Sequence, residues 1–155
     1  MSEEPSETKL IIPGLRSLYD HMEILAYPMV RAVAGLWLVP HGGSKLFGWY
    51  GGDITKTAGF FSKVGFEPAL PLAYYVGTLE FFGGLMIAIG FLTRFWAIQV
   101  IGLLAVAGFV VHWPNGFFWA DKDAEYPLMW GVIALAIFIE GGGPLSLDRK
   151  IGREF

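Results

Sequence analysis

The sequence predicts an all-α protein that crosses a membrane as a four-helix bundle. Hydrophobic residues make up 54% of the 155 residues, charged residues only 16%, and the mean hydropathy is +0.51. Soluble domains carry about 25% charged residues, because a short chain leaves much of its surface in water. Apolar runs near the roughly 20 residues that cross a bilayer recur along the chain, without the period-two alternation of a barrel. The composition therefore excludes an ordinary soluble domain.

The chain is predicted to begin with a disordered leader, residues 1–12, which carries Glu3, Glu4, Glu7 and Pro5. From Pro13 onward, apolar residues recur with helical spacing. This pattern predicts an N-terminal helix lying at the membrane interface. A first span that extends out of the lipid is the alternative.

Four stretches have the length and apolarity of transmembrane helices: about 24–43, 70–91, 95–113 and 126–140. The first outer loop contains apolar residues at helical spacing between Ile54 and Val64, which predicts a second interfacial segment. Residues 13–148 are expected to form one membrane domain, and residues 149–155 a short basic tail.

The distribution of basic residues favours cytoplasmic termini in a bacterial-type inner membrane. Four spans place both termini on one side. Six basic residues fall on that side and four on the other: Lys9, Arg16, Arg94, Arg149, Lys150 and Arg153 against Lys45, Lys56, Lys63 and Lys122. Cytoplasmic loops carry the excess of Lys and Arg.

Ionisable residues inside the spans are the first candidates for a site, because each costs roughly 2.5–3.5 kcal/mol at a helix centre. Arg31 is expected about 10 Å deep from one face and Glu80 about 15 Å deep from the other. Their depths then differ by about 5 Å, and we predict an ion pair between them. Such a pair either sets helix register alone or contributes to chemistry.

A second polar group is expected near the outer surface. His41 and Lys45 follow Arg31 on the first span, His112 ends the third, and Glu125 enters the fourth. Paired imidazoles suit proton exchange with a bound quinol. Two imidazoles and a carboxylate form a weak candidate metal site, His41, His112 and Glu125. A structural role for the histidines is the third interpretation.

Other cofactor and partner classes are excluded. The net charge of −3 gives no general attraction to nucleic acid. Without Cys, the chain forms no disulfide, thiolate zinc site or Cys-ligated iron–sulfur cluster. No haem or flavin motif is present, so no covalent cofactor is expected, and only a bound quinone would let the chain handle electrons.

Three motifs resemble the DoxX family of small integral membrane proteins. They are Arg31 followed by residues 41–48 (HGGSKLFG), residues 79–85 (LEFFGGL) continuing through 90–94 (GFLTR), and residues 143–148 (GPLSLD). The resemblance implies a four-helix membrane protein. Similar proteins occur as small subunits beside membrane redox enzymes, including quinone-linked thiosulfate and terminal oxidase systems. The family's polar positions are, in this chain, Arg31, His41, Lys45, Glu80, Arg94 and Asp148.

The leading hypothesis is a small inner-membrane subunit of a quinone-linked redox complex, more an accessory subunit than an enzyme alone. It would bind a quinone or lipid between its helices, with other membrane subunits, redox proteins among them, as partners. In this hypothesis His41 or His112 takes up the proton, Glu80 relays it, and Arg31 or Lys45 polarises a quinone carbonyl. The alternatives are a structural subunit that fills an interface of a larger membrane assembly and, third, a small carrier.

Overall fold

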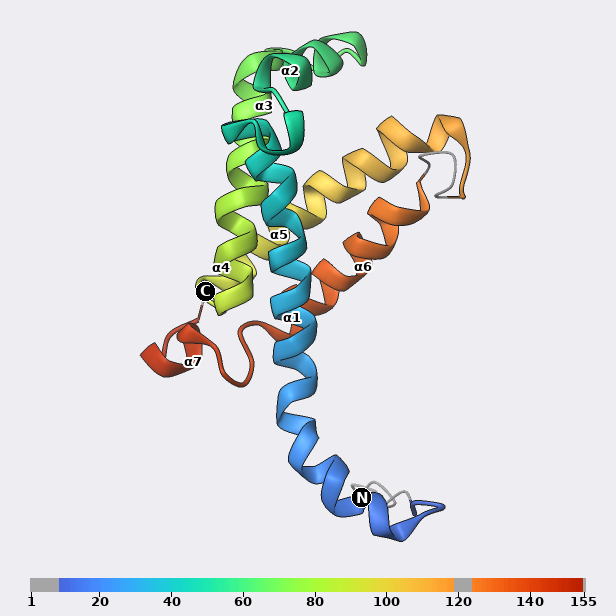
Figure 1. Ribbon diagram of the computed structural model, residues 1–155, viewed down its shortest axis with the longest axis vertical. Helices are drawn as coiled ribbons and strands as arrows, with labels where there is room; N and C mark the ends of the chain where they lie inside the picture. Colours follow the sequence, from blue (N-terminus) through green and yellow to red (C-terminus); the bar gives the residue numbers. More distant parts are fainter. Residues whose placement is uncertain (1–8, 119–123, 155) are drawn as a thin grey trace, which may run out of the picture.

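The computed structural model describes residues 9–118 and 124–154, and these residues form helices with no strand among them. The all-α prediction is confirmed. Figure 1 shows α1 as the long axis, α3 and α4 beside it, and α5 and α6 as a second hairpin inclined to the first. The main helices are α1 (Arg16–Phe47), α2 (Ile54–Lys63), α3 (Ala69–Thr78), α4 (Gly84–Ile89), α5 (Thr93–Ala105), α6 (Glu125–Glu140) and α7 (Leu147–Ile151).

Short turns join or extend these helices. Two stretches are π-helical: η3 (Leu79–Gly83) links α3 to α4, and η4 (Val106–His112) continues α5. Three turns are 3₁₀ helices, η1 (Pro13–Leu15), η2 (Trp49–Gly51) and η5 (Trp113–Asn115). Isolated π turns inside α-helices are rare and are frequent at functional sites.

Among the described residues, three helical segments are long and apolar enough to cross a membrane: Pro13–Phe47, Ala69–Ile89 and Thr93–Asn115. The helix α6, at the position of the fourth predicted span, has 16 residues. That length falls below the roughly 20 residues of a typical transmembrane helix.

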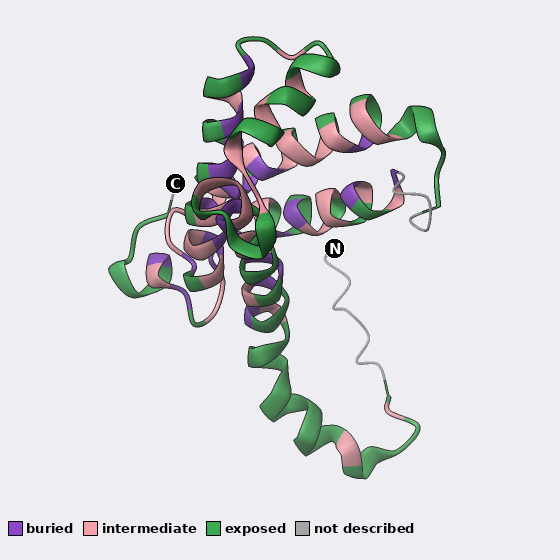
Figure 2. Cartoon of the chain, turned by 45° about the horizontal axis from the view of Figure 1, so that its top comes forward, coloured by how far each residue is buried: buried purple, intermediate pink, exposed green. Residues whose placement is uncertain are grey.

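The N-terminal interfacial helix is not a separate element, and the structure agrees with the alternative of a first span that extends toward the N-terminus. The segment after Pro13 runs without a break into α1, whose 32 residues extend about 48 Å, well beyond a hydrocarbon core of about 30 Å. No glycine or proline interrupts the chain between Arg16 and Tyr27. The first turns of α1 project away from the bundle and are exposed (Figure 2). Residues 1–8 of the predicted leader lie outside the described residues.

The helix expected in the first outer loop is present as α2, and it packs on α3. Asp53 begins it, because its side chain accepts a hydrogen bond from the backbone N–H of Thr55 at 2.6 Å.

Glycines set the register of the first hairpin, in which α1 packs against α3 and α4. A Cβ atom on Gly42 would lie only 2.6 Å from the carbonyl oxygen of Gly77, and one on Gly84 equally close to the carbonyl of Gly35. The two helices are antiparallel and their backbones nearly touch, as small residues permit between membrane helices. The core beneath this contact joins both hairpins through Ala34, Leu79, Ile87, Ala97, Val100, Ala134 and Ile137.

Candidate functional site

A largely apolar cavity of about 540 Å³ opens between α2, α3 and the continuation of α5 into η4. Its polar lining comes from Lys45, Tyr75, Glu80, Gln99 and His112. Its apolar lining is formed by Phe60, Phe61, Phe66, Leu72, Val76, Gly102, Leu103, Val106, Ala107 and Val111. Lys45, Glu80 and His112, three of the five predicted site residues, therefore line one cavity.

The Lys45 and Glu80 side chains form the charged centre of this cavity. Lys45 Nζ lies 2.6 Å from Glu80 Oε2, and the two side chains are only 19% and 11% exposed. Lys45 comes from the last turn of α1, whereas Glu80 lies in the π-helical turn η3. The ammonium also donates to the backbone carbonyl of His41 at 3.4 Å. Removal of either partner alone would leave an unpaired charge in an apolar setting. A single substitution should therefore destabilise the protein more than replacement of both residues.

Two further polar groups line the cavity. Tyr75 Oη donates to Gln99 Oε1 at 3.1 Å, which links α3 to α5. His112 ends the π-helical turn η4 and is half-buried. The π turns therefore occur where Glu80 and His112 meet the cavity.

The predicted ion pair between Arg31 and Glu80 is wrong, since both residues are described and each has other partners. The Arg31 guanidinium donates to the carbonyls of Ile87 and Ala88, at 2.8 and 3.1 Å. The Gly42–Gly77 contact sets a register in which Arg31 lies beside the end of α4. Glu80 precedes Ile87 by seven residues, which is about 10 Å of helix rise. Glu80 is therefore too far along the helix from Arg31 and pairs with Lys45 instead.

Arg31 belongs to a second polar group at the opposite end of the hairpin. Its Nη2 also donates to the Leu145 carbonyl at 3.2 Å, and its side chain is buried. The Tyr27 hydroxyl, one turn earlier on α1, donates to the carbonyl of Gly141. Both contacts hold the segment after α6 against α1.

Asp148 fixes the same segment to the turn between α4 and α5. Its carboxylate accepts hydrogen bonds from the backbone N–H groups of Leu92 and Thr93, at 2.7 and 2.9 Å, and from the Thr93 hydroxyl at 2.7 Å. A carboxylate at a helix N-terminus satisfies donors that the helix leaves unpaired. Asp148 is therefore the N-terminal anchor of α5.

Arg94 plays the matching role at the end of α6. It donates to the carbonyls of Phe138 and Ile139 at 3.1 and 3.2 Å, and pairs with Glu154 at 2.9 Å. The polar positions that the family resemblance singles out thus divide between two places. Arg31, Arg94 and Asp148 bind backbone groups, while Lys45 and Glu80 face the cavity.

His41 is exposed on α1 and is not among the residues that line the cavity. The candidate metal site of His41, His112 and Glu125 gains no support. In residues 9–118 and 124–154, no three His, Asp or Glu side chains gather closely enough to hold a metal ion.

Two carboxylates outside the spanning segments fix the wall that α2 contributes. Hydrogen bonds from the hydroxyl and backbone N–H of Thr55 hold the pKa of Asp53 below its ordinary value. The Ser62 hydroxyl, together with the Ala69 backbone N–H at 2.8 Å, lowers the pKa of Glu67 in the same way. Both ends of α2 are therefore fastened by ionised carboxylates.

Sequence reasoning missed Tyr75, Gln99 and the phenylalanines of α2. The predicted site residues are Arg, His, Lys and Glu side chains in or beside the spans, whereas Gln99 is an uncharged amide and Tyr75 a phenol. The polar amide of Gln99 in an otherwise apolar helix was an available signal, because such groups in lipid need partners.

Comparisons with known proteins agree with the motifs. The model of the DoxX family matches residues 27–113, more than half of the chain. An uncharacterized protein of Haemophilus influenzae is 33% identical over 70 residues, which cover 45% of this chain and 46% of that protein. The chain thus spans about half the length of this curated relative, and no solved structure matches. The chain is a membrane protein of the DoxX family.

Proposed function

We propose that this protein is a small subunit of a quinone-linked redox complex in the cytoplasmic membrane, and that it takes a quinone headgroup into the cavity beside Lys45 and Glu80. In this proposal α6 completes a four-helix bundle as the fourth crossing, and both termini are cytoplasmic. The segment α2 then lies at the outer interface, where its phenylalanines cover the cavity.

The observation that carries the proposal is a buried ion pair lining an apolar cavity of about 540 Å³. Sites for small molecules are typically about 300–1,000 Å³, mostly apolar, with a few polar groups that orient the ligand. A quinone matches this lining, since it combines a ring bearing two carbonyl oxygens with an apolar tail. The aromatic rings of Phe60, Phe61 and Phe66 offer surfaces against which such a ring can pack.

Each polar side chain that lines the cavity has a separate role in this proposal. A bound quinone supplies the exchange of two electrons and two protons, and the electrons pass to or from a partner subunit. The Lys45 ammonium would donate a hydrogen bond to a ring carbonyl. Glu80 holds the Lys45 side chain beside the cavity through the 2.6 Å contact, and His112 would be the proton-transfer group, since imidazole is the side chain most often used for that step. Arg31 takes no part, because its Nη1 and Nη2 groups bind carbonyls at the other end.

The test is to purify the native assembly through this chain in mild detergent, extract its quinone, and measure quinone turnover. The informative variant is Lys45→Met with Glu80→Leu, which removes both charges and leaves no unpaired one. We expect the assembled complex to retain its subunits but to lose quinone and at least about tenfold in turnover. His21→Ala, on the exposed start of α1, is the control. Unchanged quinone content and turnover in the double variant would refute the proposal.

One feature favours the alternative of a purely structural subunit. The first turns of α1, residues 16–26, are exposed throughout, although they present apolar side chains such as Leu18, Met22 and Leu25. An isolated stretch of helix gains little stability by itself in water. A neighbouring subunit or lipid would cover it. A purified assembly that contains partner subunits but no quinone would select this alternative.

A further inference from the structure

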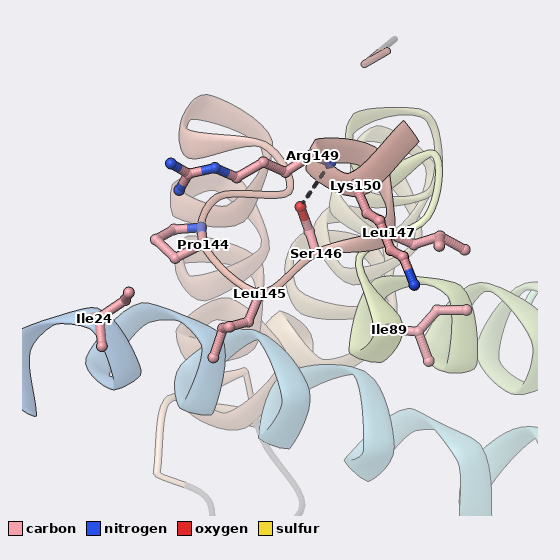
Figure 3. A pocket seen from close by; sticks show the side chains of 8 residues that line it. All are labelled: Ile24, Ile89, Pro144, Leu145, Ser146, Leu147, Arg149 and Lys150. Carbon is pink, nitrogen blue, oxygen red and sulfur yellow. Dashed lines mark hydrogen bonds between the residues drawn. The ribbon is translucent and has the colours of Figure 1, made fainter. Parts of the chain in front are cut away.

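A second hollow lies at the end of the molecule opposite the cavity. Figure 3 shows the residues that line it, which come from α1, the end of α4 and the segment that leads into α7. Its volume is about 670 Å³. Ile24, Ile89, Leu145 and Leu147 provide an apolar wall, and Arg149 and Lys150 stand at its rim. We call this hollow the α7 groove.

The α7 groove is firmly held. Ser146 Oγ accepts from the backbone N–H of Arg149 at 3.1 Å and so caps α7 (Figure 3). The backbone N–H of Asp148 donates to the Gly90 carbonyl at 2.8 Å. Leu145 has a left-handed backbone, with φ of 55°, and Arg31 binds its carbonyl. Since a β-carbon disfavours that conformation, contacts such as the one from Arg31 must hold the Leu145 backbone in it, and the Leu145 side chain is 65% exposed.

The two basic side chains at the rim have no acidic partner. Arg149 and Lys150 are exposed, and in the part of the chain that the structure describes neither lies within 4.0 Å of a carboxylate oxygen. By contrast, the guanidinium of Arg94 pairs with Glu154. Two positive charges at the rim are therefore available to a ligand from outside the chain.

The apolar wall continues the surface of two membrane-spanning segments. Ile24 belongs to the segment Pro13–Phe47, and Ile89 is the last residue of Ala69–Ile89. The groove thus begins where a span ends and leads to a pair of unpaired cations. Acyl chain, glycerol and phosphate follow one another in the same order in a phospholipid at the membrane surface.

We propose that the α7 groove binds one anionic phospholipid, whose headgroup lies at the rim between Arg149 and Lys150, which point to opposite sides in Figure 3, and whose acyl chain lies along Ile24, Ile89 and Leu145. A free phosphate would leave the apolar wall uncovered. A zwitterionic lipid would carry its own cation toward the basic rim. This site is separate from the Lys45–Glu80 cavity and does not depend on the quinone proposal.

Lipid binding to the purified, delipidated chain tests this directly, with phosphatidylglycerol and phosphatidylcholine titrated in turn and bound lipid counted by native mass spectrometry. We expect one saturable phosphatidylglycerol site. In Arg149→Gln with Lys150→Gln, affinity should fall about 25-fold, since each basic residue near an anionic surface contributes about fivefold. Lys56→Gln with Lys63→Gln makes the same charge change on α2 and should leave this site intact.

A separate substitution tests the contribution of the apolar wall to lipid binding. Ile24→Gln changes an exposed side chain, so the fold should survive, as circular dichroism and thermal unfolding would verify. Its affinity for phosphatidylglycerol should drop severalfold. Equal affinity for the two lipids, an equal loss in the α2 control, or full displacement of the lipid by inorganic phosphate would each overturn the proposal.

Discussion

Similar kinds of polar residue lie at the two ends of the first hairpin, but they bind different partners. At one end, Arg31 and Asp148 are buried, and their hydrogen bonds go to backbone groups of neighbouring segments. At the other end, Lys45 and Glu80 bind each other beside a cavity of about 540 Å³. A buried charge is therefore a candidate for binding a small molecule when its side chain faces a cavity, as those of Lys45 and Glu80 do. Where backbone carbonyls and amides bind the charge, it fastens the fold.

The largest expected effect on stability is at the end that holds Arg31, Arg94 and Asp148, which we call the fastening end. Arg31→Met removes donors from the carbonyls of Ile87, Ala88 and Leu145 and should lower the free energy of unfolding by roughly 3–5 kcal/mol. Thermal unfolding in detergent measures this, with Arg16→Met on the exposed start of α1 as the control, expected within about 0.5 kcal/mol of the parent. An Arg31→Met protein as stable as the control would mean that this end does not fasten the fold.

The register that separates the two ends depends on the glycine contacts. Gly42→Ala places a Cβ atom against the Gly77 carbonyl and should cost about 1–3 kcal/mol. Gly59→Ala is the matched control, because nothing lies within 4 Å of its Cβ position on α2. That control should be neutral or gain up to about 1 kcal/mol. If the two substitutions have equal effects on thermal unfolding, the helices are not in close contact at Gly42.

At the cavity end we expect a strong coupling between two residues and a small net effect on stability. Lys45→Met and Glu80→Leu should each destabilise more alone than together, because each single change strands a poorly solvated charge. A double-mutant cycle should give a coupling of about 1–3 kcal/mol. Additive single effects in chemical unfolding would show that the two side chains do not form a pair.

The smallest effect is a dependence on pH at α2. The pKa values of Asp53 and Glu67 are lowered in the folded protein, so both carboxylates stabilise α2 most fully above their ordinary values of 3.8 and 4.5. This stabilisation is lost as the pH falls through the lowered values. Amide hydrogen exchange, corrected for its intrinsic rate, should show less protection of α2 in acid. Asp53→Asn with Glu67→Gln should remove that pH dependence, and a response that persists would place its cause elsewhere.

The sequence was sufficient for the helical class and for the motif residues, because both follow from local patterns. Apolar length predicts helices near residues 24–43 and 70–91, and the helical spacing of apolar residues between Ile54 and Val64 predicts α2. The pairing of Arg31 was beyond reach, because register depends on which glycines meet. In the register set by the contact of Gly42 with Gly77, Arg31 lies at the end of the hairpin, away from Glu80.

The candidate site was predicted in part for a similar reason. Lys45, Glu80 and His112 stood out as charged or titratable residues in or beside apolar spans, and they line one cavity. Their grouping with Phe60 and Tyr75 depends on how α2 folds onto α3, which no local pattern specifies. The π-helical turns at Glu80 and His112 also have no sequence signal that we recognise.

The most direct test of the contrast between the two ends is equilibrium binding of a short-tailed ubiquinone to the purified chain in lipid nanodiscs. We expect saturable binding that weakens at least about tenfold in Lys45→Met with Glu80→Leu, while Arg94→Gln at the fastening end keeps the parent affinity. Equal binding by the parent and the double variant would contradict the assignment of the Lys45–Glu80 cavity as the quinone site.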